Sequence, residues 1–155
     1  MSQILIYNMS LDLYIISEKS RINKPIAFIL ENVGITDIND PNSNITYYKE
    51  YTEIWSGNIT HNLTRMAERI GIGDETLYSL LWHPQEILTL EYIEKIQIAM
   101  NILINNRKEL EKFNPPNGWG NYDTLHKFLT SYLNVLLVLK NDIIDGEVFK
   151  LRASI

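Results

Sequence analysis

The sequence predicts an α+β protein, with three to four helices packed on one face of a small antiparallel sheet of about three strands. Segments with strand-like alternation lie towards both ends of the chain, and segments with helical periodicity lie between them. The length of 155 residues, with 45% hydrophobic and 21% charged residues, suits one folded unit. We therefore expect residues 1–155 to form a single domain.

The strands are predicted from β-favouring residues that alternate with polar ones. "LDLYIIS" at 11–17 is the first strand, and residues 3–8 either extend it or form a short strand of their own. "TYYKEYTEIWS" at 46–56 suits a half-exposed antiparallel partner of the first strand. "EVFKLR" at 147–152 reads as the closing strand. Between the first two strands, residues 18–45 are rich in turn formers and predict an insertion or flap.

The first helix is predicted over "NITHNLTRMAERIG", with Asn58 as the N-cap and Gly71 as the C-terminal stop. Apolar residues recur in it at i, i+4, i+7, i+8 and i+11, which places them on one helical face. These residues are Ile59, Leu63, Met66, Ala67 and Ile70.

Three further helices follow at 74–82, 90–112 and 121–140. The first of these ends before Pro84, because the residue before a proline disfavours helical geometry. Thr89 is expected to cap the second, and Pro115 and Pro116 lie beyond its end. The predicted inward residues are Leu77, Leu80, Leu81, Ile93, Ile96, Met100, Leu103, Ile104, Leu125, Phe128, Leu129, Tyr132, Leu133 and Leu136.

Composition narrows the classes of function. The chain has no cysteine, which excludes disulfides and thiolate metal sites. A net charge of −5 argues against a nucleic-acid coat, which needs a basic face. No apolar run reaches the roughly 18 residues that a membrane helix needs, and the start lacks a basic leader. We expect a cytoplasmic protein with no nucleic-acid or membrane partner.

Three blocks of sequence carry a resemblance. They are "GNITHNLTRMAERIGI", "LYSLLWHPQE" and "FNPPNGWGNYDTLHKFLTSYL", within residues 51–152. In order and spacing they resemble a family of small proteins common in bacteriophage and bacterial genomes, whose pattern is N-I-T-H-N-L-x-x-M-A, then L-W-R-P-E-E, then N-G-W-G-x-Y. His83 and Gln85 depart from it, because the family usually has Arg and Glu there, and the 18–45 segment is longer than expected. The resemblance implies a phage-type origin but no activity.

One edge of the first predicted helix is polar. Asn58, Asn62, Arg65 and Arg69 share it at i, i+4, i+7 and i+11, with His61 further round. Amides and guanidinium groups beside the free N–H groups of a helix N-terminus suit a phosphate or a carboxylate. The alternative, which we favour, is that Asn58 caps the helix, Asn62 bonds a loop, and the arginines are solvated or paired with acidic neighbours.

Two tryptophans lie next to the ends of predicted helices, Trp82 at the end of the 74–82 helix and Trp119 just before the 121–140 helix. Trp82 and His83 stand at a helix exit, where Trp82 most often closes the edge of the core and less often serves as a stacking platform. Trp119 lies between Gly118 and Gly120, which permit two sharp bends. It either presents its indole to a cleft beside Tyr122 or tucks beneath the helices. We favour the buried position, which still allows the indole to floor a pocket.

Signs of catalysis are few. The chain has no Gly-rich phosphate loop, no G-x-S-x-G and no H-E-x-x-H. His61, His83 and His126 lack metal-ligand spacing, so we assign no catalytic residue, no metal and no cofactor.

The leading hypothesis is a non-enzymatic, phage-type binding protein for a small polar or nucleotide-like ligand, which would sequester a host defence signal. Its predicted ligand-binding residues are Asn58, His61, Asn62, Arg65, Arg69, Trp82, His83, Trp119 and Tyr122. The alternative is a protein–protein inhibitor of a host enzyme, which would use the aromatic side chains of Tyr47, Tyr48, Tyr51 and Trp55. A weaker alternative is a nucleotide-cleaving enzyme with His61 as base. An oligomer paired through strand edges is also conceivable.

Overall fold

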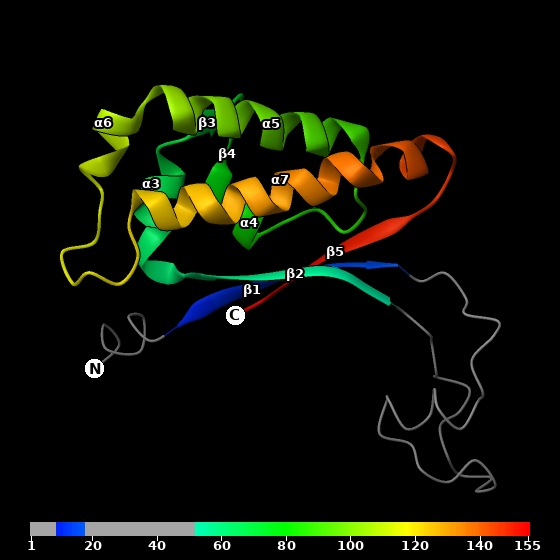
Figure 1. The fold of residues 1–155 in the computed structure, drawn as a ribbon, viewed down its shortest axis with the longest axis horizontal. Coiled ribbons are helices and arrows are strands. Elements are labelled where there is room, and N and C mark those ends of the chain that lie inside the picture. Colours follow the sequence, from blue (N-terminus) through cyan, green and yellow to red (C-terminus); the bar gives the residue numbers. More distant parts are fainter. Residues whose placement is uncertain (1–8, 18–51) are drawn as a thin grey trace, which may run out of the picture.

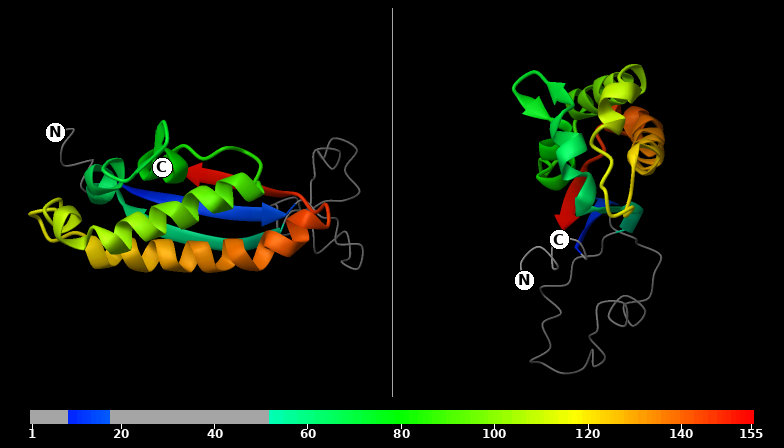
Figure 2. Two further views of the ribbon diagram at one scale, coloured as in Figure 1. Left: turned by 90° about the horizontal axis from the view of Figure 1, so that it is seen from above. Right: turned by 90° about the vertical axis from the view of Figure 1, so that its left-hand side faces the viewer.

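The computed structural model describes residues 9–17 and 52–155. A three-stranded antiparallel sheet of order β2-β1-β5 forms one layer, and the α-helices form a second layer on one of its faces (Figures 1 and 2). The strands are β1 (Ser10–Ser17), β2 (Thr52–Thr60) and β5 (Phe149–Ser154). The predicted α+β class is confirmed. The predicted strand at 3–8, the flap at 18–45 and the start of the 46–56 strand lie outside the described residues.

The inner face of the sheet carries the apolar positions of each strand. Leu11, Leu13 and Ile15 of β1 are fully buried, and Phe149 and Leu151 of β5 are almost so. Successive side chains of a strand point to opposite faces of the sheet. Every second residue therefore faces the helices, and the apolar residues at these positions form the sheet side of the core. The described residues share a single hydrophobic cluster that both layers build.

β2 continues past the predicted end of its strand. It pairs with β1 as far as Thr60, so Asn58 lies opposite Asp12 in the sheet and the prediction of a helix from Asn58 is wrong. The reason is Ile59, which a helix would place on its apolar face and which the sheet instead buries opposite Leu11. Thr60 is the actual N-cap, because its hydroxyl accepts a hydrogen bond from the Asn62 N–H.

Two short helical segments follow β2: the 3-10 helix η2 (His61–Leu63) and the helix α3 (Thr64–Glu68). Gly71 does not act as a helix stop. It belongs to β3 (Gly71–Ile72), which forms a small hairpin with β4 (Glu75–Thr76). α4 (Leu77–Trp82) begins directly after, with a capping box between Thr76 and Ser79, and it ends before Pro84 as predicted.

The predicted 90–112 helix is divided in two. Thr89 caps α5 (Leu90–Asn105) as expected, but Asn106 leaves the helical conformation and α6 (Arg107–Glu111) starts afresh. The side-chain amide of Asn106 donates to the Ile102 carbonyl at 2.8 Å and so competes with helix continuation. Burial of Ile104 was also predicted and is wrong, since 51% of that residue is exposed.

α7 (Tyr122–Ile144) is the longest helix and begins with a capping box between Asn121 and Thr124. The predicted residues Leu125, Phe128, Leu129, Tyr132 and Leu136 are buried, and Leu133 is partly buried.

α5 and α7 meet through a buried tyrosine pair. The Tyr132 and Tyr92 hydroxyls lie 2.8 Å apart, and Tyr92 donates on to the Leu80 carbonyl at 2.7 Å. Burial raises the pKa of both phenols, which keeps them neutral. Within the described part of the chain, none of the helices has the length and apolar character needed to cross a bilayer.

Candidate functional site

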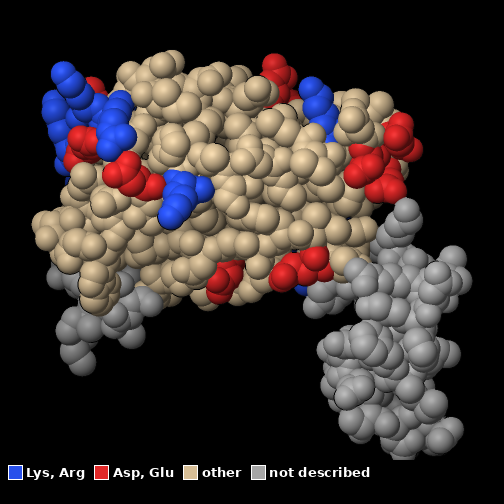
Figure 3. Space-filling model, viewed as in Figure 1, with Lys and Arg blue, Asp and Glu red and all other residues tan. Residues whose placement is uncertain are grey.

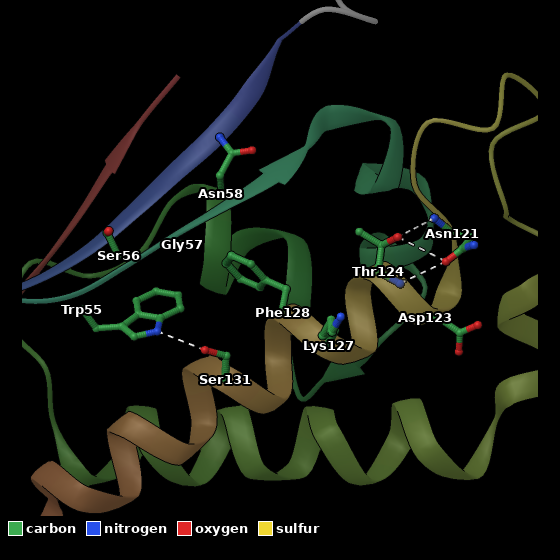
Figure 4. Close-up of a pocket in the computed structure, with 10 residues that line it drawn as sticks. All are labelled: Trp55, Ser56, Gly57, Asn58, Asn121, Asp123, Thr124, Lys127, Phe128 and Ser131. Carbon is green, nitrogen blue, oxygen red and sulfur yellow. Dashed lines mark hydrogen bonds between the residues drawn. The ribbon is translucent and has the colours of Figure 1, made fainter.

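A groove runs between the outer edge of β2 and the N-terminal half of α7. The first and third of three adjoining hollows, of about 480 and 470 Å³, form it, and the second hollow, of about 630 Å³, is lined by α7 residues alone. The first two share Asp123, Lys127 and Ser131, and the first and third share Asn58 and Thr124, so the hollows adjoin one another. Figure 4 shows the first hollow, with residues of β2 on one side and residues of α7 on the other. We call this depression the edge groove.

The backbone of β2 faces the edge groove with alternate peptide groups. His61 donates its N–H to the Met9 carbonyl at 3.3 Å, and this pair continues the register of β1 with β2. Hydrogen-bonded pairs alternate in an antiparallel ladder, so Gly57 and Ile59 direct their peptide groups to β1. The N–H groups of Ser56, Asn58 and Thr60 therefore point to the outer edge, together with the C=O groups of Ser56 and Asn58. Among the described residues no strand pairs with that edge.

The floor of the groove is aromatic. The Trp55 indole lies across Gly57 and meets Phe128 edge-on, with ring centroids 5.7 Å apart. Its Nε1–H donates to the Ser131 hydroxyl of α7 at 3.1 Å. A Cβ on residue 57 would collide with the Trp55 ring and lie 2.9 Å from Phe128. Gly57 is thus required for the indole to lie flat here.

The α7 rim of the groove is polar. Asn121 and Thr124 bond each other's backbone N–H groups, at 3.0 and 3.2 Å, and so complete the helix cap. The Asp123 carboxylate accepts from Arg107 at 3.0 Å. Lys127 stands one turn beyond Asp123, and its ammonium group has no ion pair within the described ranges. The rim therefore offers hydroxyls, amides and one uncompensated cation.

Of the predicted site residues, Asn58 and Trp119 line the groove. The Asn58 amide donates to Ser10 at 2.8 Å and to Asp12 at 2.7 Å, so its side chain ties β2 to β1. Trp119 borders the third hollow and is 51% exposed. The favoured prediction that its indole is buried is therefore wrong. The loop conformation holds the ring out, because the Trp119 N–H donates to Asn117 Oδ1 and both flanking glycines have positive φ.

His61 and Trp82 form a hydrogen-bonded pair away from the groove lining. Trp82 is 2% exposed, so it closes the core edge as favoured, and its indole N–H donates to His61 Nδ1 at 2.8 Å. Nδ1 is then the unprotonated nitrogen and Nε2 carries the proton. Nε2 is buried without a hydrogen-bond partner among the described residues. Burial also lowers the pKa of His61 below its ordinary value, which favours the neutral ring.

The three sequence blocks meet around η2. Trp82 of the second block bonds His61 of the first, and Asn117 of the third block donates to Asn62 Oδ1 at 3.3 Å. Gly120 packs so closely that a Cβ there would lie 2.8 Å from the Thr60 methyl group. The three blocks therefore pack against one another, and their contacts hold the chain segments together instead of surrounding a common hollow.

The remaining predicted residues lie outside the groove lining. Arg65 is exposed on α3, and Arg69 places its guanidinium over the Phe113 ring at 4.8 Å. His83 meets the Tyr78 hydroxyl at 3.4 Å. Tyr122 is 3% exposed and donates its hydroxyl to the Leu103 carbonyl at 2.6 Å, so the alternative in which it flanks Trp119 in a cleft is wrong.

The predicted anion site loses its physical basis. It required the N-terminus of a regular helix at Asn58, whereas Asn58 lies in β2 and α3 has five residues. Figure 3 shows Lys and Arg gathered at the α6 end of this face, with Asp and Glu among them. Arg107 there bonds Glu111 and Asp123. In the described part of the chain no group of His, Asp and Glu side chains is placed to hold a metal ion.

Sequence reasoning missed most of the groove. Lys127, Thr124 and Ser131 belong to the polar face of a helix whose apolar face was recognised, and Trp55 was assigned to an exposed surface. Gly57 within a β-rich run was the available signal, because an interior strand glycine often marks a close approach. Comparison of the chain with protein-family models, with curated proteins and with solved structures found no match.

Proposed function

We propose that the protein is a non-enzymatic binding protein and that its ligand lies in the edge groove. The observation that carries this proposal is the combination of a strand edge that no described strand pairs with, an aromatic floor and a polar rim in adjoining hollows. Binding sites typically join apolar walls with a few convergent polar groups. The edge groove is open along its length, and this shape suits an elongated ligand better than a compact ligand that needs an enclosed cavity.

A small polar ligand at the Trp119 end is the second candidate. It is favoured by the half-exposed indole, which borders a hollow of about 470 Å³ together with Asn58, Thr60 and Thr124. A flat ring stacked on Trp119 would find amide and hydroxyl partners within this hollow. The protein would contact a nucleotide-like ligand in this hollow through the base and the sugar of the ligand.

The other hypotheses receive less support. For a protein–protein inhibitor, Tyr47, Tyr48 and Tyr51 lie outside the described residues, and Trp55 packs against Phe128 and Tyr132. For a nucleotide-cleaving enzyme, His61 has no free lone pair, because Nδ1 accepts from Trp82 and Nε2 carries the proton. The phage-type origin and the host defence signal stay predictions that rest on the resemblance.

To test the proposal, the edge groove is filled by a substitution, and the loss of ligand binding is measured. Lys127→Trp places an indole where two of the hollows meet, whereas Lys140→Trp makes the same change on α7 outside the groove lining. Cyclic and ADP-ribose-like nucleotides and a displayed peptide library are screened against the unchanged protein. A ligand at about 100 times its dissociation constant adds roughly 2.7 kcal/mol of stability in thermal denaturation. We expect Lys127→Trp to abolish this gain and Lys140→Trp to keep it. Equal stabilisation of both variants would refute the groove as the site.

A further inference from the structure

We infer that the occupant of the edge groove is an extended polypeptide segment of another protein, which adds to the sheet as a strand beside β2. This inference rests on the proposed function and names its partner. The outward-facing peptide groups of β2 would bind the backbone of this segment. In strand addition, main-chain hydrogen bonds give affinity and side-chain pockets give specificity.

The first step concerns the backbone. Ser56 and Asn58 direct their N–H and C=O groups to the outer edge, and Thr60, whose C=O caps η2, adds its N–H; no described strand receives these groups. On the opposite edge of the sheet, Leu88 donates to the Phe149 carbonyl at 2.9 Å and Leu151 donates to the Glu86 carbonyl at 2.8 Å. One edge is thus covered by a segment of the chain, and the other presents a hydrogen-bonding ladder that residues 9–17 and 52–155 leave unused.

The second step concerns side chains. Those of an added strand would alternate between the outer face of the sheet and the side that faces α7. On the α7 side they meet the floor formed by Trp55 and Phe128. An apolar or aromatic residue at an inward position would cover that floor and remove it from water.

The third step concerns charge. Asp123 is engaged by Arg107 at 3.0 Å, whereas Lys127 has no ionic partner within the described ranges. An acidic residue of the segment, close to the inward apolar residue, would therefore meet a positive rim. The expected ligand is an extended segment that combines an apolar anchor with Asp or Glu.

The peptide side is tested by selecting a displayed library of random peptides on the full-length protein. Each peptide nitrogen of the tightest binder is then methylated in turn, which removes one N–H donor at a time. An added strand bonds β2 through every second residue, so we expect alternate methylations to weaken binding about tenfold and the intervening ones to leave it nearly unchanged. Losses without this alternation would overturn the inference.

The protein side is tested with Ser56→Pro and its control Ser56→Ala. Proline removes an N–H that β1 does not use, so the sheet should persist while the peptide loses a partner. We expect affinity to fall about tenfold for Ser56→Pro and to stay within about twofold for Ser56→Ala. Bound peptide should also slow hydrogen exchange at the Ser56, Asn58 and Thr60 amides, without changing Gly57 and Ile59, which already bond β1.

The outcomes separate the two proposals. If nucleotides bind and Lys127→Trp abolishes that binding while no peptide is selected, strand addition is overturned and the groove remains the site. If selected peptides bind Lys127→Trp and the unchanged protein equally, the groove itself is refuted. If Ser56→Pro converts a dimer to a monomer in sedimentation and no peptide competes with the dimer, the occupant is a second copy and the inference is overturned.

Discussion

Along the outer edge of β5, residues 86–88 exchange two backbone hydrogen bonds with the strand, and Ile87 forms a bridge with Lys150. Along the outer edge of β2, the described chain provides no such cover, and a groove separates the strand from α7. Both edges carry the same repeating peptide groups, so the difference lies in what packs beside them. An edge strand left uncovered is a liability that folded proteins normally protect.

The largest expected effect comes from breaking the covered edge. Leu88 is 2% exposed and anchors the segment that covers β5, so Leu88→Ala should lower the free energy of unfolding by about 3 kcal/mol. Ile87 beside it is 40% exposed, and Ile87→Ala should change it by less than about 1 kcal/mol. Urea denaturation measures both. Similar losses for the two variants would mean that the covering segment is not anchored through Leu88.

The next effect lies where the open edge meets the third block. Gly120 has φ of +91° and no room for a Cβ beside Thr60, so Gly120→Ala should cost about 2 to 3 kcal/mol of stability. Gly118 has φ of +76° but open space around it, so Gly118→Ala should cost only about 1 kcal/mol. The difference between the two denaturation midpoints isolates the close approach. Equal costs would show that backbone conformation alone requires these glycines.

A third effect concerns pH at the corner that follows β2. Because burial lowers the pKa of His61 in the folded state, the unfolded chain binds a proton first as pH falls below about 6.5. Stability should be independent of His61 above that pH and should decrease from there down through the lowered folded pKa. The slope should remain under roughly 1.4 kcal/mol per pH unit, since the ring is partly exposed and solvent screens it.

His61→Gln should remove this component of the slope, whereas His126→Gln should keep it. Urea denaturation at several pH values, with an NMR titration of the His61 ring, measures the effect. A His61 ring that titrates at or above its ordinary pKa would contradict the assignment of Nδ1 as the acceptor for Trp82.

The smallest effect is expected on the open edge. Ser131→Ala removes the acceptor of the Trp55 indole N–H at an exposed position. Water can replace that acceptor in an open groove, so the loss should be about 0.5 kcal/mol or less. Tryptophan fluorescence during denaturation follows both the stability and the environment of the indole. A loss above about 2 kcal/mol would indicate that this side of the groove is closed to solvent.

Local patterns were sufficient for much of the fold. The alternation of "LDLYIIS", the Thr89 cap and the apolar stripe of α7 each depend on neighbours within a few residues, and the structure confirms them. The end of β2 was mispredicted, because Ile59 fits a helical stripe and a strand face equally well. Only pairing with Leu11 decides between them.

The candidate site depended on the tertiary structure almost entirely. The sequence by itself determined the α+β class, the starts of α5 and α7 and the residues able to fill a core, because these follow from the periodicity and the caps of single segments. Tertiary packing decided that Trp82 and Tyr122 are buried while Trp119 is half exposed, and that one sheet edge is covered while the other borders a groove. These outcomes depend on which segments meet across the fold, and that information is not contained in any one segment.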